Sequence, residues 1–237
     1  MKLSILMPAY NEAATVERTL DAVLATPQEK EIILVDDGST DGTLEIIRRL
    51  GEEHPDIKVL VHGRNQGKGA AVRTALGAAT GDVVLIQDCD LEYDPNDYTR
   101  LLEPIVNGDA EVVFGTRSFS SHTSFSFWFV VGNKLVTLAT NVLFNCYISD
   151  METCYKVMRL EAARKLHLTA RGFELEPQIT GGLLNLGYQI YEVPVEYKAR
   201  TREQGKKLTW TDGLHAIQTL VIVRLQRNRD RRRASLS

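Results

Sequence analysis

Short apolar runs alternate with amphipathic helical segments along the first half of this 237-residue chain, and this alternation limits the possible folds most strongly. The runs are apolar throughout, which is typical of strands buried on both faces of a sheet. Helices between such strands favour parallel connections. We therefore predict an α/β fold with a Rossmann-like, mostly parallel central sheet flanked by helices. The expected strands are residues 2–7, 31–35, 58–61, 83–87 and 111–114, and the expected helices are residues 12–24, 43–50, 67–79 and 96–106.

The second half of the chain has a less regular pattern. It predicts helices at residues 126–144, 173–186 and 210–227, and strands at residues 154–160 and 188–197. The length suits one α/β domain and is too short for two well-filled ones. We expect a catalytic domain over residues 1–208, with an amphipathic helix and basic tail over residues 209–237 packed on it.

Composition excludes several classes of protein. A net charge of −3 argues against nucleic-acid binding. The three cysteines, Cys89, Cys146 and Cys154, match no zinc spacing and indicate a reducing compartment. No signal peptide is visible, and Asn133 and Lys134 interrupt the best transmembrane candidate. We expect a cytoplasmic protein, with peripheral attachment to the cytoplasmic face of a membrane as an open alternative.

Asp88-Cys89-Asp90 directly follows the apolar run at residues 83–87. In an extended segment, residues two apart point the same way, so the two carboxylates would repel each other without a cation between them. Oxygen ligands favour Mg²⁺ or Mn²⁺. Glu92 continues the same alternation and is a candidate third ligand. Ordinary solvated acids are the alternative, but the position at a strand end favours a metal site.

Three more polar segments are expected at the same edge of the sheet, because ligands bind beyond the carboxyl ends of parallel strands. They are residues 8–12, 36–39 and 115–117. Asp36-Asp37 follows the second strand, and Asp37 is a candidate hydrogen-bond acceptor for a nucleobase. Residues 63–69 are rich in glycine and begin a helix, so they either bind an anion or only cap the helix. A P-loop is excluded because Gly69 stands where Ser or Thr is required. Gly115-Thr116-Arg117 follows a later strand.

The segment 199–207 contains four basic residues, Arg200, Arg202, Lys206 and Lys207. Alone it is typical of a solvated loop. Beside an acidic metal site, it could close over a diphosphate leaving group.

Together these stretches resemble the glycosyltransferase family 2 pattern on a GT-A fold, most closely its dolichyl-phosphate mannosyltransferase (polyprenyl-phosphate glycosyltransferase) branch. The matching stretches are residues 4–12, 35–43, 65–69, 88–92 and 115–117, with looser matches at 149–156, 173–176 and 205–207.

The resemblance implies a role for each matching residue. The nucleoside would be held by Pro8, Tyr10, Glu12, Val35 and Asp37. Asp88 and Asp90 would hold the diphosphate and the metal, with Glu92 as a further ligand, while Lys68 and Cys89 would also line the nucleotide-sugar site. Arg117 would face the acceptor phosphate, and Lys207 with Arg202 or Arg200 would clamp the leaving diphosphate.

The implied reaction is inverting transfer of a hexose from GDP-mannose or a UDP-hexose to a polyprenyl or dolichyl phosphate. A hydroxyl acceptor on a glycan or lipid is the alternative, and it would need a base, for which Asp150 and Glu152 are candidates unless they only support the site. A sugar-phosphate nucleotidyltransferase ranks lower, since residues 8–12 lack a glycine-rich loop with arginine. The intact acidic triplet and Arg117 argue against a non-catalytic binding module.

Membrane contact is a further hypothesis. It rests on the Arg-rich end of the last helix, residues 224–233, and on the apolar patch at residues 125–129. A core-packing helix with a solvated tail is the alternative, and the oligomeric state is left open.

Overall fold

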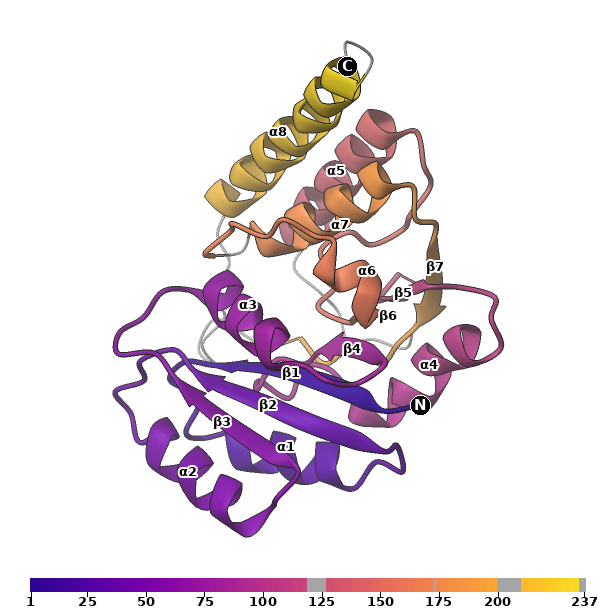
Figure 1. Cartoon of the computed structure of the whole chain (residues 1–237). Coiled ribbons are helices and arrows are strands. Elements are labelled where there is room, and N and C mark those ends of the chain that lie inside the picture. Colours follow the sequence, from indigo (N-terminus) through magenta and orange to yellow (C-terminus); the bar gives the residue numbers. More distant parts are fainter. Residues whose placement is uncertain (119–126, 173, 200–209, 235–237) are drawn as a thin grey trace.

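A seven-stranded mixed sheet forms the centre of the molecule in the computed structural model, which describes residues 1–118, 127–172, 174–199 and 210–234 (Figure 1). The strand order is β3-β2-β1-β4-β6-β5-β7. The strands are β1 (Leu3–Ala9), β2 (Lys30–Asp36), β3 (Ile57–Val61), β4 (Val83–Ile86), β5 (Val112–Thr116), β6 (Lys156–Arg159) and β7 (Ile190–Pro194).

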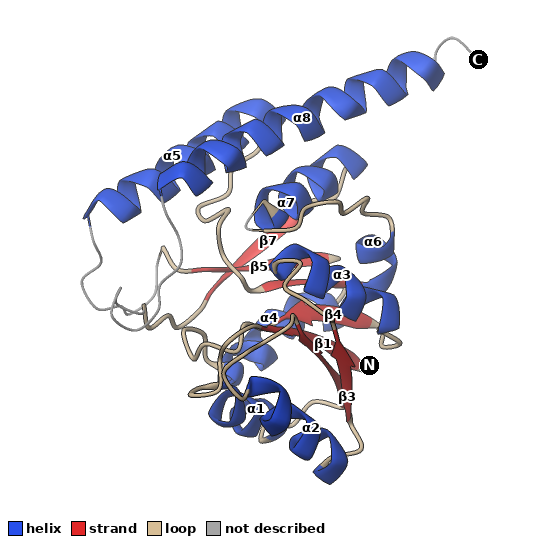
Figure 2. Cartoon of the chain, turned by 90° about the vertical axis from the view of Figure 1, so that its left-hand side faces the viewer, coloured by secondary structure: helices blue, strands red, loops and turns tan. Residues whose placement is uncertain are grey.

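Helices flank this sheet on both sides. Against the strands β1, β2 and β3, α1 and α2 lie on one face and α3 lies on the other (Figures 1 and 2). The predicted α/β fold with a mostly parallel sheet is confirmed. The helices are α1 (Val16–Leu24), α2 (Thr43–Glu53), α3 (Lys68–Ala78), the 3-10 turn η1 (Pro95–Asp97), α4 (Tyr98–Val106), α5 (Phe127–Phe144), α6 (Leu160–Arg164), α7 (Leu175–Leu186) and α8 (Trp210–Ala234).

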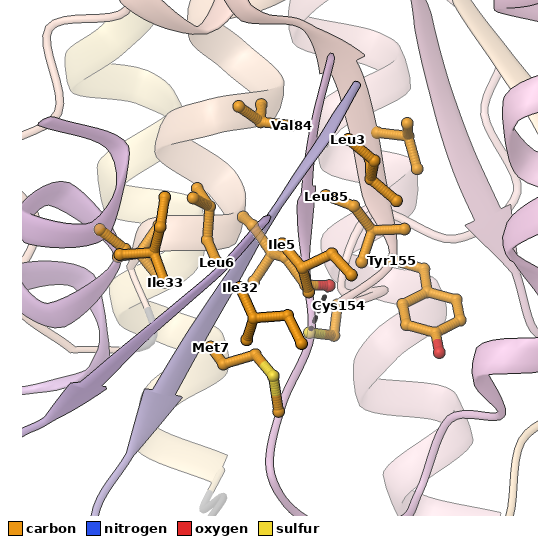
Figure 3. Close-up of a cluster of buried hydrophobic side chains, with 14 of the residues drawn as sticks. Leu3, Ile5, Leu6, Met7, Ile32, Ile33, Val84, Leu85, Cys154 and Tyr155 are labelled. Carbon is orange, nitrogen blue, oxygen red and sulfur yellow. Dashed lines mark hydrogen bonds between the residues drawn. The ribbon is translucent and has the colours of Figure 1, made fainter. Parts of the chain in front are cut away.

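The apolar runs that predicted the strands form the main core. Leu6 on β1, Ile33 on β2 and Val84 on β4 are all buried and belong to one continuous cluster (Figure 3). Each such side chain contributes about 1.5–3 kcal/mol when it leaves water. Both faces of β1, β2 and β4 are covered, which explains why their sequences are continuously apolar rather than alternating.

Strand β6 runs in the opposite direction to its neighbours, which the sequence did not predict. It pairs antiparallel with both of its neighbours, through Val84↔Met158 on β4 and Val113↔Val157 on β5. Consequently its N-terminal end meets the carboxyl ends of β4 and β5. The residues just before Lys156 therefore lie at the edge of the sheet where the loops after β1, β2, β4 and β5 gather.

A second, smaller core joins the end of the chain to the domain. Val136 and Phe144 on α5 form a buried cluster with Leu220 and Val223 on α8. Helix α8 also packs on α7, and its C-terminal part extends away from the sheet (Figure 2). The division of the chain at residue 208 stays a prediction, since residues 200–209 lie outside the described part. In that part, the helices are too short or too polar to cross a membrane.

Gly67 allows two distant loops to touch. It has a left-handed φ of +92°, and a Cβ atom there would lie only 2.2 Å from the carbonyl oxygen of Arg171. The next glycine, Gly69, donates its backbone N–H to the same oxygen at 2.7 Å. This contact holds the start of α3 against the loop that leads into α7.

We predict that Gly67→Ala destabilises the protein by about 2 kcal/mol or more, because it combines a strained φ with a backbone clash. Gly77→Ala is the matched control, since Gly77 lies on the exposed side of the same helix and a Cβ atom there meets nothing within 4 Å. That control should be neutral or stabilising by up to about 1 kcal/mol. Urea unfolding measures both; equal effects of the two substitutions would contradict the close-contact role of Gly67.

Candidate functional site

A cavity of about 370 Å³ lies at the carboxyl edge of the sheet. Its walls come from the ends of β1, β2, β4 and β5, the start of α3, the segment before β6, and the region of α7. The lining residues are Pro8, Ala9, Tyr10, Glu12, Asp37, Asn65, Gly67, Lys68, Ala71, Asp88, Cys89, Asp90, Glu92, Tyr93, Arg117, Glu152, Cys154, Gly172, Glu176 and Tyr197. Most residues that the sequence singled out therefore meet in one place.

The expected nucleoside residues are only partly at this cavity. Pro8, Tyr10 and Glu12 line it. Val35 does not, because its side chain lies inside β2 and is fully buried. Val35 can therefore reach a ligand only through its backbone, and its contact with a nucleoside stays a prediction.

Asp37 lines the cavity while it organises a neighbouring loop. Its carboxylate accepts hydrogen bonds from the backbone N–H groups of Gln66 at 3.0 Å and Gly67 at 2.7 Å. His62 Nδ1 lies 2.7 Å from the same carboxylate. Asp37 therefore holds the glycine-rich loop in place, and a contact with a nucleobase stays a prediction.

The acidic triplet adopts a turn instead of the extended form on which its prediction depended. Residues 89 and 90 form the turn, and Leu91 has a left-handed φ of 60°. Asp90 Oδ1 closes the turn by accepting the N–H of Glu92 at 3.0 Å, as aspartates in turns commonly do. The predicted extended conformation of the triplet was wrong, but Asp88, Cys89 and Asp90 all line the cavity.

A buried network fixes the backbone in front of this turn. The hydroxyl groups of Tyr98 and Tyr155 both donate to Gln87 Oε1 at 2.7 Å. The amide nitrogen of Gln87 donates to the carbonyl oxygen of Asp88 at 2.9 Å. The triplet is thereby anchored to the core.

Lys68, the first residue of α3, joins two carboxylates across the cavity. Its Nζ lies 2.9 Å from Asp88 Oδ2 and 2.9 Å from Glu176 Oε1. Burial would lower the pKa of Lys68, but the charges of Asp88 and Glu176 outweigh it and raise the pKa well above its ordinary value. Lys68 is therefore a fixed cation beside the triplet.

The predicted metal ligands fit a hard divalent cation only in part. Asp88 and Asp90 offer carboxylate oxygens from one turn, as Mg²⁺ or Mn²⁺ prefers. Glu92 Oε2 instead accepts a hydrogen bond from the Tyr197 hydroxyl at 2.7 Å. In the described parts of the chain, His, Cys, Asp and Glu side chains form no group of three or more arranged to hold a metal. The diphosphate of a bound donor would have to complete the coordination of a metal held by Asp88 and Asp90.

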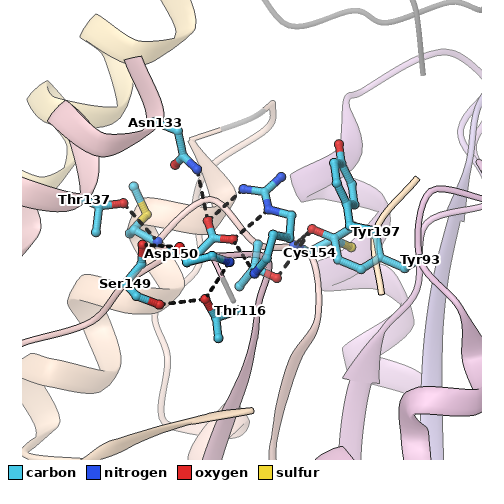
Figure 4. Close-up of polar contacts among 12 residues, drawn as sticks. Tyr93, Thr116, Asn133, Thr137, Ser149, Asp150, Cys154 and Tyr197 are labelled. Atoms are coloured by element: carbon cyan, nitrogen blue, oxygen red, sulfur yellow. Dashed lines mark hydrogen bonds and ion pairs between the residues drawn. The ribbon is translucent and has the colours of Figure 1, made fainter. Parts of the chain in front are cut away.

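Arg117 lines the cavity and forms an ion pair with the buried Asp150, whose polar contacts Figure 4 shows. Arg117 Nε and Nη2 donate to Asp150 Oδ2 and Oδ1, each at 2.7 Å, and the backbone N–H of Arg117 adds a third bond. The guanidinium group also lies over the ring of Tyr197, 4.9 Å from its centroid. Arg117 is therefore held firmly at the cavity wall.

This pairing changes the expected role of Asp150. Burial would raise the pKa of Asp150, but Arg117 and Asn133 outweigh it and lower the pKa to about 2. A carboxylate so strongly stabilised is a poor proton acceptor. We therefore interpret Asp150 as the group that positions Arg117, and not as a base.

The pKa of Glu152 is shifted in the opposite direction to that of Asp150. Burial and the charge of Glu176 raise the pKa of Glu152 to about 7. Glu152 lines the cavity directly, unlike Asp150.

Sequence reasoning missed several lining residues. Glu176 lies in a motif that resembled the family, but no role was predicted for it. Tyr93 and Tyr197 both line the cavity, with ring centroids 5.1 Å apart and ring planes tilted by 57°. Cys154 lines the cavity because β6 runs antiparallel to β4 and β5, and no local sequence pattern predicts that direction. Arg200, Arg202 and Lys207 lie outside the described residues.

We predict that Asp150→Asn lowers the free energy of unfolding by about 3 kcal/mol, because it removes the negative charge that pairs with Arg117 in a mostly buried ion pair. Asp109→Asn, at an exposed position after α4, should change stability by less than about 0.5 kcal/mol. Chemical denaturation at neutral pH measures both. Similar stability of the two variants would contradict the importance of the buried pair.

Comparison with known proteins gives relatives for both sequence and fold. The dolichol-phosphate mannosyltransferase of Pyrococcus furiosus is 27% identical over 87% of this chain and 59% of that protein. The low-salt glycan biosynthesis hexosyltransferase Agl6 of Haloferax volcanii is 25% identical over 93% of this chain and 53% of that protein. The chain thus spans little more than half the length of these relatives.

Glucosyl-3-phosphoglycerate synthase from Mycobacterium tuberculosis has a similar fold. Its structure with Mn²⁺, UDP and glucosyl-3-phosphoglycerate superposes with a TM-score of 0.69 at 22% identity, covering 94% of this chain and 79% of that one. The sequence profile described as glycosyl transferase family 2 matches residues 4–166. Since this match covers more than half of the chain, the protein belongs to glycosyl transferase family 2, and its fold is of the GT-A type.

Proposed function

We propose that this protein transfers a hexose from GDP-mannose or a UDP-hexose, with inversion, to a polyprenyl or dolichyl phosphate. One observation carries the proposal: the cavity contains the predicted groups in the lateral order of the strands. Asp37 follows β2, Tyr10 follows β1, the acidic triplet follows β4, and Arg117 follows β5. A donor nucleoside, its diphosphate and an acceptor anion would occupy this row in the same order.

The residues would divide the chemistry between them. Asp88 and Asp90 would hold Mg²⁺ or Mn²⁺, and such an ion supplies positive charge that stabilises a departing diphosphate. Lys68 places a further cation beside Asp88. Arg117, already oriented by Asp150, would hold the acceptor phosphate so that its oxygen attacks the anomeric carbon opposite the leaving group. Arg202 or Arg200, with Lys207, would clamp the nucleoside diphosphate.

The lipid acceptor is supported by the Pyrococcus relative, which is named a dolichol-phosphate mannosyltransferase, and by the surface of the helical region. Helix α5 packs beside α8 and carries an apolar face that is exposed to solvent. Its exposed members are Phe127, Trp128, Leu135, Leu138 and Val142. Such a face, with the Arg-rich sequence at residues 224–233, is suited to an anionic membrane surface.

A hydroxyl acceptor is the second candidate. Carboxylates outnumber cations among the described cavity residues, and Arg117 is already neutralised by Asp150. This balance favours a neutral acceptor over an anionic one, unless the basic segment at residues 200–207 compensates it.

We expect one nucleotide from a panel of GDP, UDP and their sugar conjugates to raise the melting temperature with Mn²⁺ and much less with EDTA. Asp90→Asn should remove most of this metal-dependent shift and reduce sugar transfer at least about a hundredfold, because one of the two ligands loses its charge. Transfer is measured with a short polyprenyl phosphate and, in parallel, with hydroxyl acceptors. Unchanged transfer by Asp90→Asn in EDTA would refute the metal assignment.

We expect sedimentation with anionic phosphatidylglycerol vesicles at low salt and little with neutral vesicles. The double variant Trp128→Ser/Leu138→Ser should bind these vesicles several-fold more weakly, because it removes two large exposed apolar groups. Val106→Ser, at an exposed apolar position on α4, is the matched control. Equal binding by the double variant and the control would rule out α5 as the contact surface.

A further inference from the structure

We propose that His62 positions the carboxylate of Asp37 for the nucleobase of the donor, and that Thr74 fixes the orientation of the His62 ring. This inference rests on the proposed nucleotide-sugar transfer and adds two positioning residues to it. Neither His62 nor Thr74 is among the described residues that line the cavity, so both act on a ligand through Asp37, which lines it.

The His62 side chain joins three elements behind the cavity wall. His62 follows β3, Asp37 follows β2, and Thr74 lies on α3. His62 Nδ1 lies 2.7 Å from Asp37 Oδ1, and His62 Nε2 lies 2.9 Å from Thr74 Oγ1. The side chains of His62 and Asp37 are only 10% and 3% exposed, so water weakens their contact little.

The two contacts of the ring require one tautomer. An ionised carboxylate only accepts hydrogen bonds, so His62 Nδ1 carries the hydrogen and donates to Asp37. In the neutral ring Nε2 is then an acceptor, and the hydroxyl group of Thr74 donates to it. The backbone N–H of His62 also donates to the carbonyl oxygen of Asp36 at 2.8 Å. The ring is therefore fixed at both nitrogens and at its backbone.

These contacts leave the Asp37 carboxylate with one oxygen for a ligand. Oδ1 accepts the N–H of Gln66 at 3.0 Å in addition to the His62 ring. Oδ2 accepts the N–H of Gly67 at 2.7 Å, and this is its single donor among the described residues. Each carboxylate oxygen can accept about two hydrogen bonds. Oδ2 thus keeps an acceptor position, whereas without His62 the carboxylate could turn and offer Oδ1 instead.

A carboxylate held in one orientation distinguishes between nucleobases. Uracil and guanine carry a ring N–H on the edge used for base pairing, and a carboxylate can accept it. Cytosine and adenine have an acceptor nitrogen at the equivalent place, which a carboxylate repels. The positioned Asp37 should therefore favour uridine and guanosine diphosphates, which are the leaving groups of the proposed donors.

The test measures base preference, which a purely structural role of His62 would leave unchanged. The full chain with Mn²⁺ is titrated calorimetrically with UDP and CDP, and with GDP and ADP. His62→Ala should lower the preference for UDP over CDP, or for GDP over ADP, about tenfold and leave binding of CDP or ADP within about twofold. Thr74→Val should lower the same preference about threefold, because the ring stays but loses its orientation.

Two further variants serve as rescue and control. His62→Asn retains an amide that can donate to Asp37, so its base preference should stay within about threefold of wild type. His167→Ala, at an exposed position after α6, should change neither binding nor preference. Thr74→Val keeps the shape of its side chain and carries the decision if His62→Ala does not fold.

Several outcomes would overturn the inference. Equal weakening of both members of a pair by His62→Ala would limit His62 to supporting the fold, and an unchanged preference would show that Asp37 needs no positioning. Full preference in Asp37→Asn would exclude Asp37 as the contact of the nucleobase. Equal binding of all four nucleotides by the wild type would refute this inference and leave the proposed transfer standing. Absence of binding by any of them would refute the proposed function.

Discussion

The antiparallel pairing of β6 between β4 and β5 is the constraint on which the site depends. It turns the segment before β6 toward the edge where the parallel strands end, and so brings Asp150 to Arg117 and Glu152 to the cavity. With a parallel β6, these acids would lie at the opposite edge of the sheet. The positions of Tyr10, Asp37 and Asp88 follow from the parallel strands β1, β2 and β4 alone, whereas the positions of Asp150 and Glu152 require this reversal.

Much of the fold could be predicted because its signals are local. The strands β1, β2 and β4 are buried on both faces, so burial appears directly as continuous apolar runs. The direction of β6 could not be predicted, since a four-residue strand carries no signal of orientation and long-range pairing sets it. The same applies to the site: residue types at strand ends indicated Asp88, Asp90 and Arg117, but not the partners that the fold gives them.

One particular expectation failed for a physical reason. The alternation of Asp88 and Asp90 assumed an extended chain, and the side chain of Asp90 closes a turn instead. The partners of Asp37 were equally hard to predict, because the N–H groups of Gln66 and Gly67 that it binds lie about thirty residues away in sequence.

The contact between Gly67 and the carbonyl of Arg171 also has an evolutionary consequence. Two segments far apart in the chain meet through their backbones. No side chain lies between them, so a substitution could not restore the contact if the spacing changed. Relatives that keep this contact can vary the lengths of their peripheral loops. An insertion on either side of the contact would move α3 away from α7 and break the ion pair between Lys68 and Glu176. Insertions and deletions among such relatives should therefore avoid both segments, even where the surrounding sequence has diverged.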